Sequence, residues 1–278
     1  MDKNKYSVLM SVYCNENPDF FIESIESMLK QTIKPDEIVI VKDGPLTVEL
    51  DNIIDLYVEK EKSLYTIISL ERNQGLGLAL NKGLENCRNE LVARMDTDDI
   101  SFENRCELQL AEFKKNSKLS INGAWTNEFF DDPSHIVTSR IVPETHKEIK
   151  RFSRRRSPFN HPTVMYKKSA VLAIGGYRDI LRKEDIDLFV RMIHNGSISM
   201  NIPQPLLYYR SNKDNYKRRK SWTNCKSYIF VIYSFWKAGY SSIIDLVIVT
   251  LGQIGMYITP VWVIKIVSDS VLRKKLKK

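Results

Sequence analysis

Short apolar runs alternate with amphipathic stretches along the first 100 residues. Residues 6–14 and 36–44 are apolar and rich in β-branched side chains, as expected of buried strands. Between them, a helical pattern over 20–32 gathers Phe21, Ile22, Ile25, Met28 and Leu29 on one face. The same reasoning predicts helices over 46–60 and 75–87 and strands over 65–71 and 90–96. This alternation predicts an α/β fold with a doubly wound, mostly parallel sheet flanked by helices.

Carboxylates lie at the ends of two of these strands. Asp43 follows the second strand, and Asp96, Asp98 and Asp99 lie at the end of the fourth. In doubly wound sheets, ligands bind at the carboxyl ends of the strands. We therefore expect the functional site at this edge of the sheet.

The alternation is less regular beyond residue 100. The pattern predicts an amphipathic helix over 101–116, a strand over 121–130, and a strand or helix over 171–180 that ends in a Gly-Gly turn. A further helix is expected over 183–196, with Gly196 as its C-cap. Its first turn carries Glu184, Asp185 and Asp187, which the positive end of the helix dipole favours.

From Ile229 onward the chain is strongly apolar and then ends in a basic tail. Residues 243–267 are long enough to cross a bilayer, although four residues interrupt them, namely Asp245, Gln253, Pro260 and Lys265. Trp236, Tyr257 and Trp262 are aromatic residues of the kind found at headgroup depth. We expect membrane-associating helices that lie at the interface. Helices packed on the domain, or a true span, are the alternatives.

The net charge of +8 is unevenly distributed. Residues 1–100 have a net charge of −8, whereas residues 201–278 contain only three acidic side chains. The acidic front half argues against a nucleic-acid partner, and the basic, apolar tail suggests an anionic membrane surface. The four cysteines are scattered, as reduced thiols are in cytosolic proteins, and the start has too short an apolar run for a secretory signal. We expect a cytoplasmic protein, peripheral on the inner face of the cell membrane.

Asp96, Asp98 and Asp99 crowd three carboxylates into four positions. Such crowding is unfavourable unless a positive charge lies against it. The Asp-x-Asp spacing places Asp96 and Asp98 on the same side of an extended segment. Oxygen ligands of this kind suit Mn²⁺ or Mg²⁺, which commonly share them with a substrate diphosphate. The alternative is a solvated acidic turn in which Asp98 or Asp99 caps the next helix.

A second charged segment is basic, with five Lys and Arg residues in the seven positions from Lys150 to Arg156. It could contact a diphosphate or an anionic lipid, or form a solvated loop. The histidines His135, His146 and His194 have no metal-binding spacing, so we expect them to be structural or on the surface.

Six motifs occur in a fixed order along the chain. They are SVLMSVYCNENPDFFIESIESMLKQT (7–32), DEIVIVKDG (36–44), NQGLGLALNKGL (73–84), ARMDTDD (93–99), HPTVMYKKSAVLAIGGY (161–177) and KEDIDLFVRM (183–192). Together they resemble glycosyltransferase family 2, which has the GT-A fold, over about residues 5–210. More narrowly, VKDGPLT and NQGLGLALN resemble bacterial enzymes that add glucose or galactose to lipid-linked O-antigen or capsule intermediates.

The resemblance implies a role for each matching residue. For the nucleotide-sugar it implies Ser11, Val12 and Tyr13 along the nucleotide with Glu16 close by, Asp43 at the uracil ring, Asp96 at the ribose and Arg191 at the phosphates. For the metal it implies Asp98 as principal ligand, with Asp96, supported by Asp99, and His161 near the metal or diphosphate. For proton transfer it implies Asp185 as general base, with Glu184 beside it.

The activity implied is that of a metal-dependent inverting glycosyltransferase. It would move a hexose from a UDP-sugar to a polyprenyl-diphosphate-linked saccharide and form a β linkage. A divalent ion stabilises the leaving group, and one carboxylate deprotonates the acceptor, so no second nucleophile is required. On this view residues 1–220 form the GT-A domain, with a nucleotide-sugar half (about 1–100) and an acceptor half (about 101–220), and residues 221–278 form the C-terminal helices and basic tail.

The chain departs from the family pattern at two places. Lys42 precedes Asp43 where many relatives have a second acid, and Leu80 stands where many have arginine. Lys42 or Arg72 could replace that arginine at the phosphates. The Gln-x-x-Arg-Trp signature of processive synthases is missing, so we expect one sugar to be added per encounter. A nucleotidyltransferase of related fold and a non-catalytic membrane adaptor with a transferase-like core are the rival readings.

Overall fold

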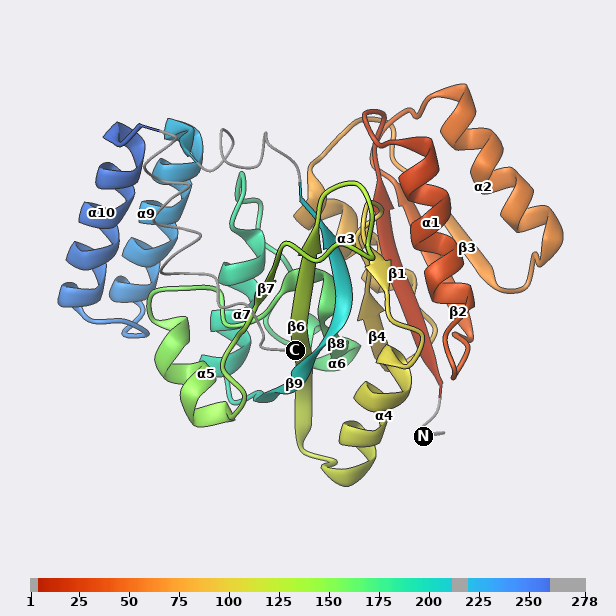
Figure 1. The fold of residues 1–278 in the computed structure, drawn as a ribbon. Helices are drawn as coiled ribbons and strands as arrows, with labels where there is room; N and C mark the ends of the chain where they lie inside the picture. Colours follow the sequence, from red (N-terminus) through yellow and green to blue (C-terminus); the bar gives the residue numbers. More distant parts are fainter. Residues whose placement is uncertain (1–4, 212–219, 261–278) are drawn as a thin grey trace.

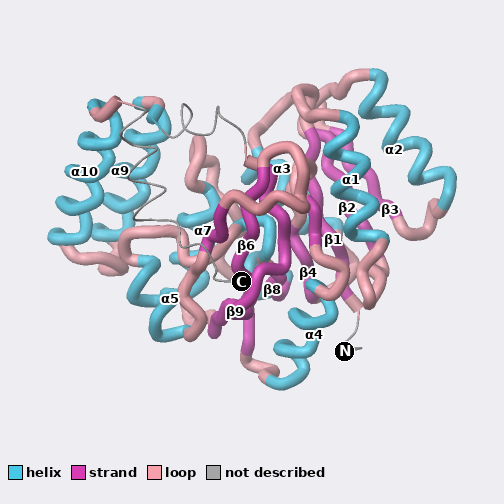
Figure 2. The backbone as a smooth tube through the Cα atoms, in the orientation of Figure 1, coloured by secondary structure: helices cyan, strands magenta, loops and turns pink. Residues whose placement is uncertain are grey.

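The computed structural model describes residues 5–211 and 220–260. Within them, a central mixed sheet is flanked by helices (Figures 1 and 2). Its strands are β1 (Tyr6–Val12), β2 (Glu37–Lys42), β3 (Tyr65–Ser69), β4 (Leu91–Arg94), β5 (Ile100–Ser101), β6 (Leu119–Phe129), β7 (Thr138–Arg140), β8 (Met165–Lys167) and β9 (Ile198–Arg210). The order across the sheet is β3-β2-β1-β4-β8-β6-β9-β5, with β7 beside β6.

The helices cover both faces of this sheet. They are α1 (Pro18–Leu29), α2 (Val48–Lys60), α3 (Leu76–Asn86), α4 (Arg105–Lys115), α5 (His146–Ser153), α6 (Lys168–Leu172), α7 (Glu184–His194), α9 (Trp222–Lys237) and α10 (Ile243–Ile258), with a 3-10 turn η1 at His161–Thr163. The strands and helices predicted before residue 116 are confirmed, with shifts of a few residues at their ends. The segment 171–180 begins as the end of α6 and continues through Gly175 and Gly176, both at positive φ.

The pairing of the strands changes half-way across the sheet. Strands β3, β2, β1 and β4 are parallel, as predicted. β8 then pairs antiparallel with both β4 and β6, while β6 and β9 are parallel. The long strand β9 was not predicted, because it contains Pro203 and Pro205, which cannot donate to a strand ladder. The register of β6 against β9 is irregular where Trp125 lies opposite Pro205.

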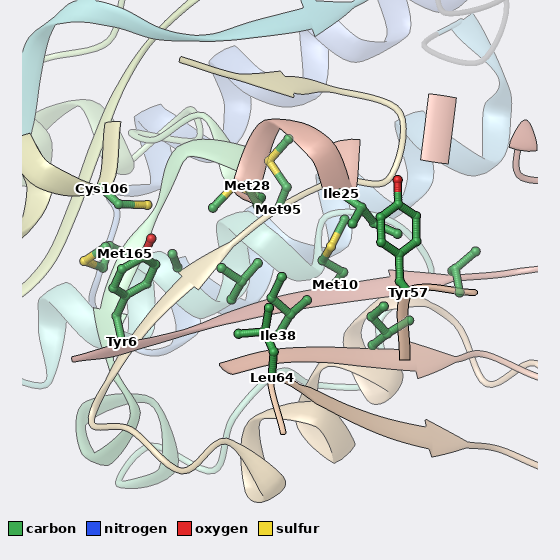
Figure 3. Close-up of a cluster of buried hydrophobic side chains, with 14 of the residues drawn as sticks. Tyr6, Met10, Ile25, Met28, Ile38, Tyr57, Leu64, Met95, Cys106 and Met165 are labelled. Carbon is green, nitrogen blue, oxygen red and sulfur yellow. The ribbon is translucent and has the colours of Figure 1, made fainter. Parts of the chain in front are cut away.

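Strand β1 shows why the sheet is buried on both faces. Tyr6, Val8, Met10 and Val12 point into a core shared with α1, α2 and α4, part of which Figure 3 shows. Leu9 points the other way, into a core shared with α3, α5, α6 and α7. Because successive side chains of a strand alternate between faces, one apolar run supplies both cores. The carboxyl ends of the first strands are thereby fixed from both sides.

Helices α9 and α10 form a third layer on the outer side of α7 (Figure 1). Val231, Ile232 and Phe235 of α9 and Val249 of α10 pack with Ile186 and Val190 of α7. Asp187, Leu188, Phe189 and the rest of the inward surface of α7 are buried as well. α7 therefore lies between the domain core and the C-terminal helices.

The basic segment of residues 150–156 has a part in this docking. It begins inside α5, and Arg154 and Arg155 both reach Asp245 in the first turn of α10, each at 2.5 Å. Burial acts to raise the pKa of Asp245, but hydrogen bonds from Ser242 and the two guanidinium groups hold that pKa well below its usual range. Arg154 and Arg155 therefore have an ion-pair partner in the protein, although both side chains stay partly exposed.

Replacing Asp245 with asparagine should lower the free energy of unfolding by about 1–2 kcal/mol, because both arginine contacts lose their charged partner. Urea denaturation at pH 7 measures this loss. Asp55→Asn, an exposed position on α2, is the matched control and should leave the unfolding free energy unchanged. Equal stability of the two variants would show that the arginines do not hold α10 in place.

Helices α9 and α10 carry many exposed apolar side chains. We call these the outer apolar face, and they are Trp222, Phe230, Tyr233, Trp236, Ile243, Ile244, Val247, Ile248, Leu251, Ile254, Tyr257 and Ile258. Over the part of the chain that the structure describes, no helix has the length and apolar character needed to cross a membrane. Residues 261–267 of the expected apolar stretch and the basic tail lie outside the described residues.

Candidate active site

Three carboxylates meet at the carboxyl end of β4. One oxygen from each of Asp96, Asp98 and Asp99 lies within 4.8 Å of the others. The loop that carries them is held to the neighbouring elements, since the hydroxyl of Ser24 in α1 donates to the Asp96 carbonyl at 2.7 Å. The Thr97 hydroxyl also donates to Glu16, in the loop after β1. The loop after β1 and helix α1, which come much earlier in the chain, thus hold the acidic loop in place.

Burial makes this cluster electrostatically strained. Burial, and then the charges of Asp96 and Glu16, raise the pKa of Asp98 to about 7. Asp99 is fully buried, and burial followed by the charge of Asp98 raises its pKa well above the usual range. Its Oδ1 accepts a hydrogen bond from the Arg210 backbone N–H at 2.8 Å, whereas Oδ2 has no partner among the described residues. A cation would relieve the repulsion within this group.

Arg94 supplies the positive charge that the crowded carboxylates require. It is 1% exposed, lies at the end of β4 and forms an ion pair with Asp96. Burial acts to lower the pKa of Arg94, but the Asp96 carboxylate outweighs this effect and keeps the guanidinium charged. Its Nε and Nη1 have no hydrogen-bond partner among the described residues. The sequence analysis missed this residue, although an arginine inside an apolar strand, two positions before an acid, was a usable signal.

Arg210 is a second cation that the sequence analysis missed. It ends β9, where its Nε donates to the Asp98 carbonyl at 2.9 Å and its guanidinium also pairs with Glu23. The guanidinium lies 3.9 Å from the centre of the Phe20 ring. Because Arg210 follows the acidic cluster by more than 100 residues, only the pairing of β9 with β5 brings the two together.

The residues expected along the nucleotide lie at the ends of β1 and β2. Ser11 and Val12 close β1, Tyr13 is exposed beyond it, and Glu16 bonds to Thr97 of the acidic loop. The parallel pairing of β1 with β4 places the β1 end on the same edge as the acids. The predicted convergence at this edge is therefore confirmed, while the individual contacts with a nucleotide stay predictions.

Asp43, expected at the uracil ring, is buried and orders the start of α3. Its Oδ1 accepts from the Gln74 N–H at 2.7 Å and its Oδ2 from the Gly75 N–H at 3.1 Å. Gly44, at φ +87°, allows the chain to turn there, because a Cβ at this position would lie 2.6 Å from the Asn73 nitrogen. Lys42, considered as a phosphate contact, instead pairs with Asp51 of α2 at 2.5 Å.

Glu184 and Asp185 open helix α7, as predicted. Two left-handed residues, Arg182 (φ 65°) and Lys183 (φ 72°), turn the chain into this helix. Such backbone is costly outside glycine and concentrates at functional sites. The Ser157 hydroxyl is shared between the Phe159 carbonyl at 3.1 Å and Asp185 Oδ2 at 3.3 Å. The carboxylate of Asp185 is thereby oriented by the segment that follows the arginines of residues 150–156.

His161, expected near the metal or diphosphate, lies outside the carboxylate group in the described part of the chain. Its Nε2 forms a hydrogen bond with the Tyr177 hydroxyl at 2.9 Å. Burial, and then the charge of Arg94, lower its pKa well below the usual range, so the imidazole is neutral. Tyr177 is in turn held by Asn81, which bonds to both its backbone N–H and its carbonyl. The structure thus places His161 beside Arg94 and leaves its role as a ligand a prediction.

Arg191 requires a correction. It was expected to neutralise phosphate charge, but it is buried and all three guanidinium nitrogens are used internally. Nε pairs with Asp187 Oδ2 at 2.7 Å, and the other two donate to the carbonyls of Ile174 and Gly176. Arg191 therefore holds the Gly-Gly turn that precedes Tyr177.

Glu184 should make the stability of the fold depend on pH. Burial, and then the neighbouring charge of Asp185, raise the pKa of Glu184 from 4.5 to about 7. Between these pH values the folded protein retains a proton that the unfolded chain releases, so the unfolding free energy falls as the pH rises. Glu184→Gln cannot titrate and should gain about 1–2 kcal/mol relative to the wild type between pH 5 and pH 7. Urea denaturation at both pH values measures the difference, and parallel pH profiles would contradict it.

The two acidic groups share one electrostatic environment around Arg94. The charge of Arg94 acts on the pKa values of Asp98 and Asp99 on one side and of Glu184 on the other. The site therefore combines a carboxylate trio suited to a cation with a separate carboxylate pair at a helix start. The trio fits a hard divalent ion, because all its donors are oxygens and Asp99 Oδ2 lacks a partner among the described residues.

The chain is similar in sequence to known glycosyltransferases. The chain is 37% identical over 259 residues to an Escherichia coli UDP-Gal:alpha-D-GlcNAc-diphosphoundecaprenol beta-1,3-galactosyltransferase, covering 93% of each chain. It is 36% identical over 222 residues to the amylovoran biosynthesis glycosyltransferase AmsE of Erwinia amylovora, covering 80% of this chain and 82% of AmsE.

The fold is also that of solved glycosyltransferases. The mannosyltransferase PcManGT from Pyrobaculum calidifontis, solved in complex with GDP-Man and Mn²⁺, superposes with a TM-score of 0.63 at 14% identity. The superposition covers 92% of this chain and 70% of PcManGT. Residues 7–175 match the family description Glycosyl transferase family 2. The chain belongs to glycosyltransferase family 2.

Proposed function

We propose that this enzyme moves a hexose, galactose or glucose, from a UDP-sugar to a saccharide linked to a polyprenyl diphosphate. The observation that carries the proposal is the carboxylate trio of Asp96, Asp98 and Asp99, with Arg94 acting electrostatically both on this trio and on Glu184, the neighbour of Asp185. A sugar-transfer site needs both parts, one for the leaving diphosphate and one for the acceptor proton. The similarity to the E. coli galactosyltransferase supports the choice of sugar and acceptor.

The donor would lie along the carboxyl edge of the first strands. Ser11, Val12 and Tyr13 follow the nucleotide, and Asp43 faces its base. Asp98, with Asp96 and Asp99, would hold Mn²⁺ or Mg²⁺. When bound, the ion stabilises the negative charge that develops on the departing diphosphate. Arg94 has two unpartnered nitrogens among the described residues, and we assign it to the same diphosphate.

The acceptor hydroxyl would be activated by Asp185. Its oxygen attacks the anomeric carbon as the bond from that carbon to the diphosphate oxygen breaks, the hydroxyl proton passes to Asp185, and UDP leaves. Ser157 orients the Asp185 carboxylate through the hydrogen bond to Oδ2. A single displacement inverts the anomeric centre, so an α-linked donor gives a β linkage.

The outer apolar face supports a location at the membrane. Its side chains, among them Ile244, Leu251 and Ile258 of α10, are exposed. An apolar helical face with aromatic and basic neighbours is typical of helices that lie in the membrane interface. We propose that this face rests on the anionic inner surface of the cell membrane, where a lipid-linked acceptor is available.

A transfer assay tests the proposed function. Purified protein with Mn²⁺ is incubated with UDP-galactose, UDP-glucose or UDP-N-acetylglucosamine and with N-acetylglucosaminyl-diphosphoundecyl as acceptor, and products are analysed by mass spectrometry and NMR. We expect one added hexose in a β linkage, and no product with EDTA. Absence of product with every donor, together with absence of metal-dependent UDP binding, would overturn the proposal and favour a non-catalytic adaptor.

A further inference from the structure

A cavity of about 830 Å³ lies between α5 and the start of α10. Its lining includes four arginines, Arg151 from α5 and Arg154, Arg155 and Arg156 after it. Residues 141–145 form another wall. The acidic cluster of the active site does not contribute to the lining, so this is a separate feature of the surface.

Three acids line the cavity with its four arginines, and two of them, Glu148 and Asp245, are already engaged, whereas Glu144 is exposed. Glu148 closes the capping box of α5, where its Oε2 accepts hydrogen bonds from the Thr145 N–H and hydroxyl. Asp245 is bound by Ser242 and by two arginines that share its single carboxylate. Arg156 lies over the Phe152 ring at 5.5 Å and forms no ion pair with any described residue. The cavity therefore keeps guanidinium donors for an anion, and guanidinium groups are well suited to phosphate.

The arginines directly precede, in the sequence, a residue that contacts the proposed general base. Arg156 is followed directly by Ser157, whose hydroxyl donates to Asp185 Oδ2. The Tyr228 hydroxyl donates to the Arg155 carbonyl at 2.8 Å and is within electrostatic reach of both Arg156 and Asp185. The segment that carries these arginines therefore also contacts the proposed general base.

Apolar side chains border the cavity as well. Asp245 lines the cavity, and the exposed Ile243 and Ile244 precede it directly at the start of α10. Ile141, also exposed, lies in the cavity wall. The cavity and its border therefore combine guanidinium groups with apolar side chains. This combination suits a diphosphate that is joined to a hydrocarbon chain.

We infer that the cavity between α5 and α10 binds the diphosphate of the lipid-linked acceptor, with Arg151 and Arg156 as its contacts. The inference rests on the proposed function and adds the site at which the diphosphate of the acceptor binds. A phospholipid headgroup offers similar chemistry, but the direct connection through Ser157 to Asp185 favours a phosphate that is joined to the reacting sugar.

The test uses the double variant Arg151→Ala/Arg156→Ala, which spares Arg154 and Arg155 because they hold α10. We expect the KM for N-acetylglucosaminyl-diphosphoundecyl to rise at least about tenfold, as expected for the loss of charge-assisted hydrogen bonds. The KM for the UDP-sugar should stay within about twofold of the wild type. Lys147→Ala, which removes an exposed charge from the same helix outside the cavity, is the matched control and should change neither value.

A second acceptor separates the possible outcomes. Undecyl N-acetylglucosaminide carries the same sugar without phosphate, and the double variant should use it as the wild type does. An unchanged KM for the diphosphate acceptor, or an equal rise for both acceptors, overturns the inference. So does loss of binding to phosphatidylglycerol vesicles with an unchanged KM for the soluble diphosphate acceptor, which would assign the arginines to phospholipid.

Calorimetry in the absence of a UDP-sugar measures acceptor binding without requiring turnover. The wild type should bind N-acetylglucosaminyl-diphosphoundecyl at least about tenfold more tightly than the double variant. If binding shows this difference but no donor gives product, the proposed function fails and the anion site stands. If the wild type makes product and the two proteins bind the acceptor equally, the anion site fails and the proposed function stands.

Discussion

Asp98→Ala should reduce sugar transfer at least about 10³-fold, because it removes the oxygen that we propose as the principal ligand of the divalent ion. UDP binding in the presence of Mn²⁺ should weaken about 10- to 100-fold, while the weaker binding in EDTA should not change. Isothermal titration with UDP, with and without Mn²⁺, measures both effects. Transfer within about tenfold of the wild-type rate would place the metal elsewhere.

Loss of activity through unfolding can be distinguished from this result. In the absence of metal, Asp98→Ala should be at least as stable as the wild type, because removing one carboxylate relieves repulsion from Asp96 and Glu16. Asp55→Ala removes an exposed carboxylate of α2, outside the acidic cluster, and should alter neither stability nor transfer.

Asp185→Asn should lower kcat about 10²- to 10⁴-fold, the range that general-base catalysis contributes. Asparagine keeps the size of the side chain and can still accept the hydrogen bond from Ser157, but it cannot take up the acceptor proton. The dissociation constant for UDP with Mn²⁺ should stay within about twofold of the wild type. Steady-state kinetics and calorimetry on the same preparation give the two values.

The informative result for Asp185→Asn is that kcat should fall while UDP binding stays nearly unchanged. Asp185→Glu retains a carboxylate and should recover part of the activity, which a purely structural role would not explain. A wild-type rate in Asp185→Asn would mean that another group, with Glu184 the nearest candidate along the chain, accepts the proton.

The edge of the sheet that bears the site could be predicted from the sequence. Strand ends are marked by a change from apolar to acidic residues, and parallel pairing sends the ends of β1, β2 and β4 to one edge. Asp43 and the Asp96–Asp99 cluster were therefore found from local pattern alone. The same pattern located Glu184 and Asp185 at the start of α7.

The cations around the acids could not all be predicted in this way. The pairing of β9 with β5 brings Arg210 to Asp98 and Asp99. Strand β9 could not be predicted from the sequence because it contains prolines. Arg191 was misplaced even though its spacing from Asp187 is that of a side-chain pair on one helix face. That local pair uses the charge, so Arg191 is not available to a phosphate.

The C-terminal helices illustrate a different limit of sequence analysis. Interfacial helices and helices packed on the domain were treated as alternatives, but α9 and α10 have one face packed on α7 and another exposed. The sequence shows the apolar content, whereas the division between the two faces depends on the position of α7. The contacts of Arg154 and Arg155 with Asp245 likewise join segments 90 residues apart.

The incomplete hydrogen bonding of Arg94 and Asp99 has a consequence for the amount of enzyme in a cell. Within the described residues, these buried groups leave polar atoms without partners, which lowers the stability of the folded chain. Substrates that satisfy those atoms bind only the folded form and so shift the equilibrium away from the unfolded form that proteases degrade. If the substrates satisfy these atoms as we propose, we expect the lifetime of the enzyme to follow the supply of its nucleotide-sugar.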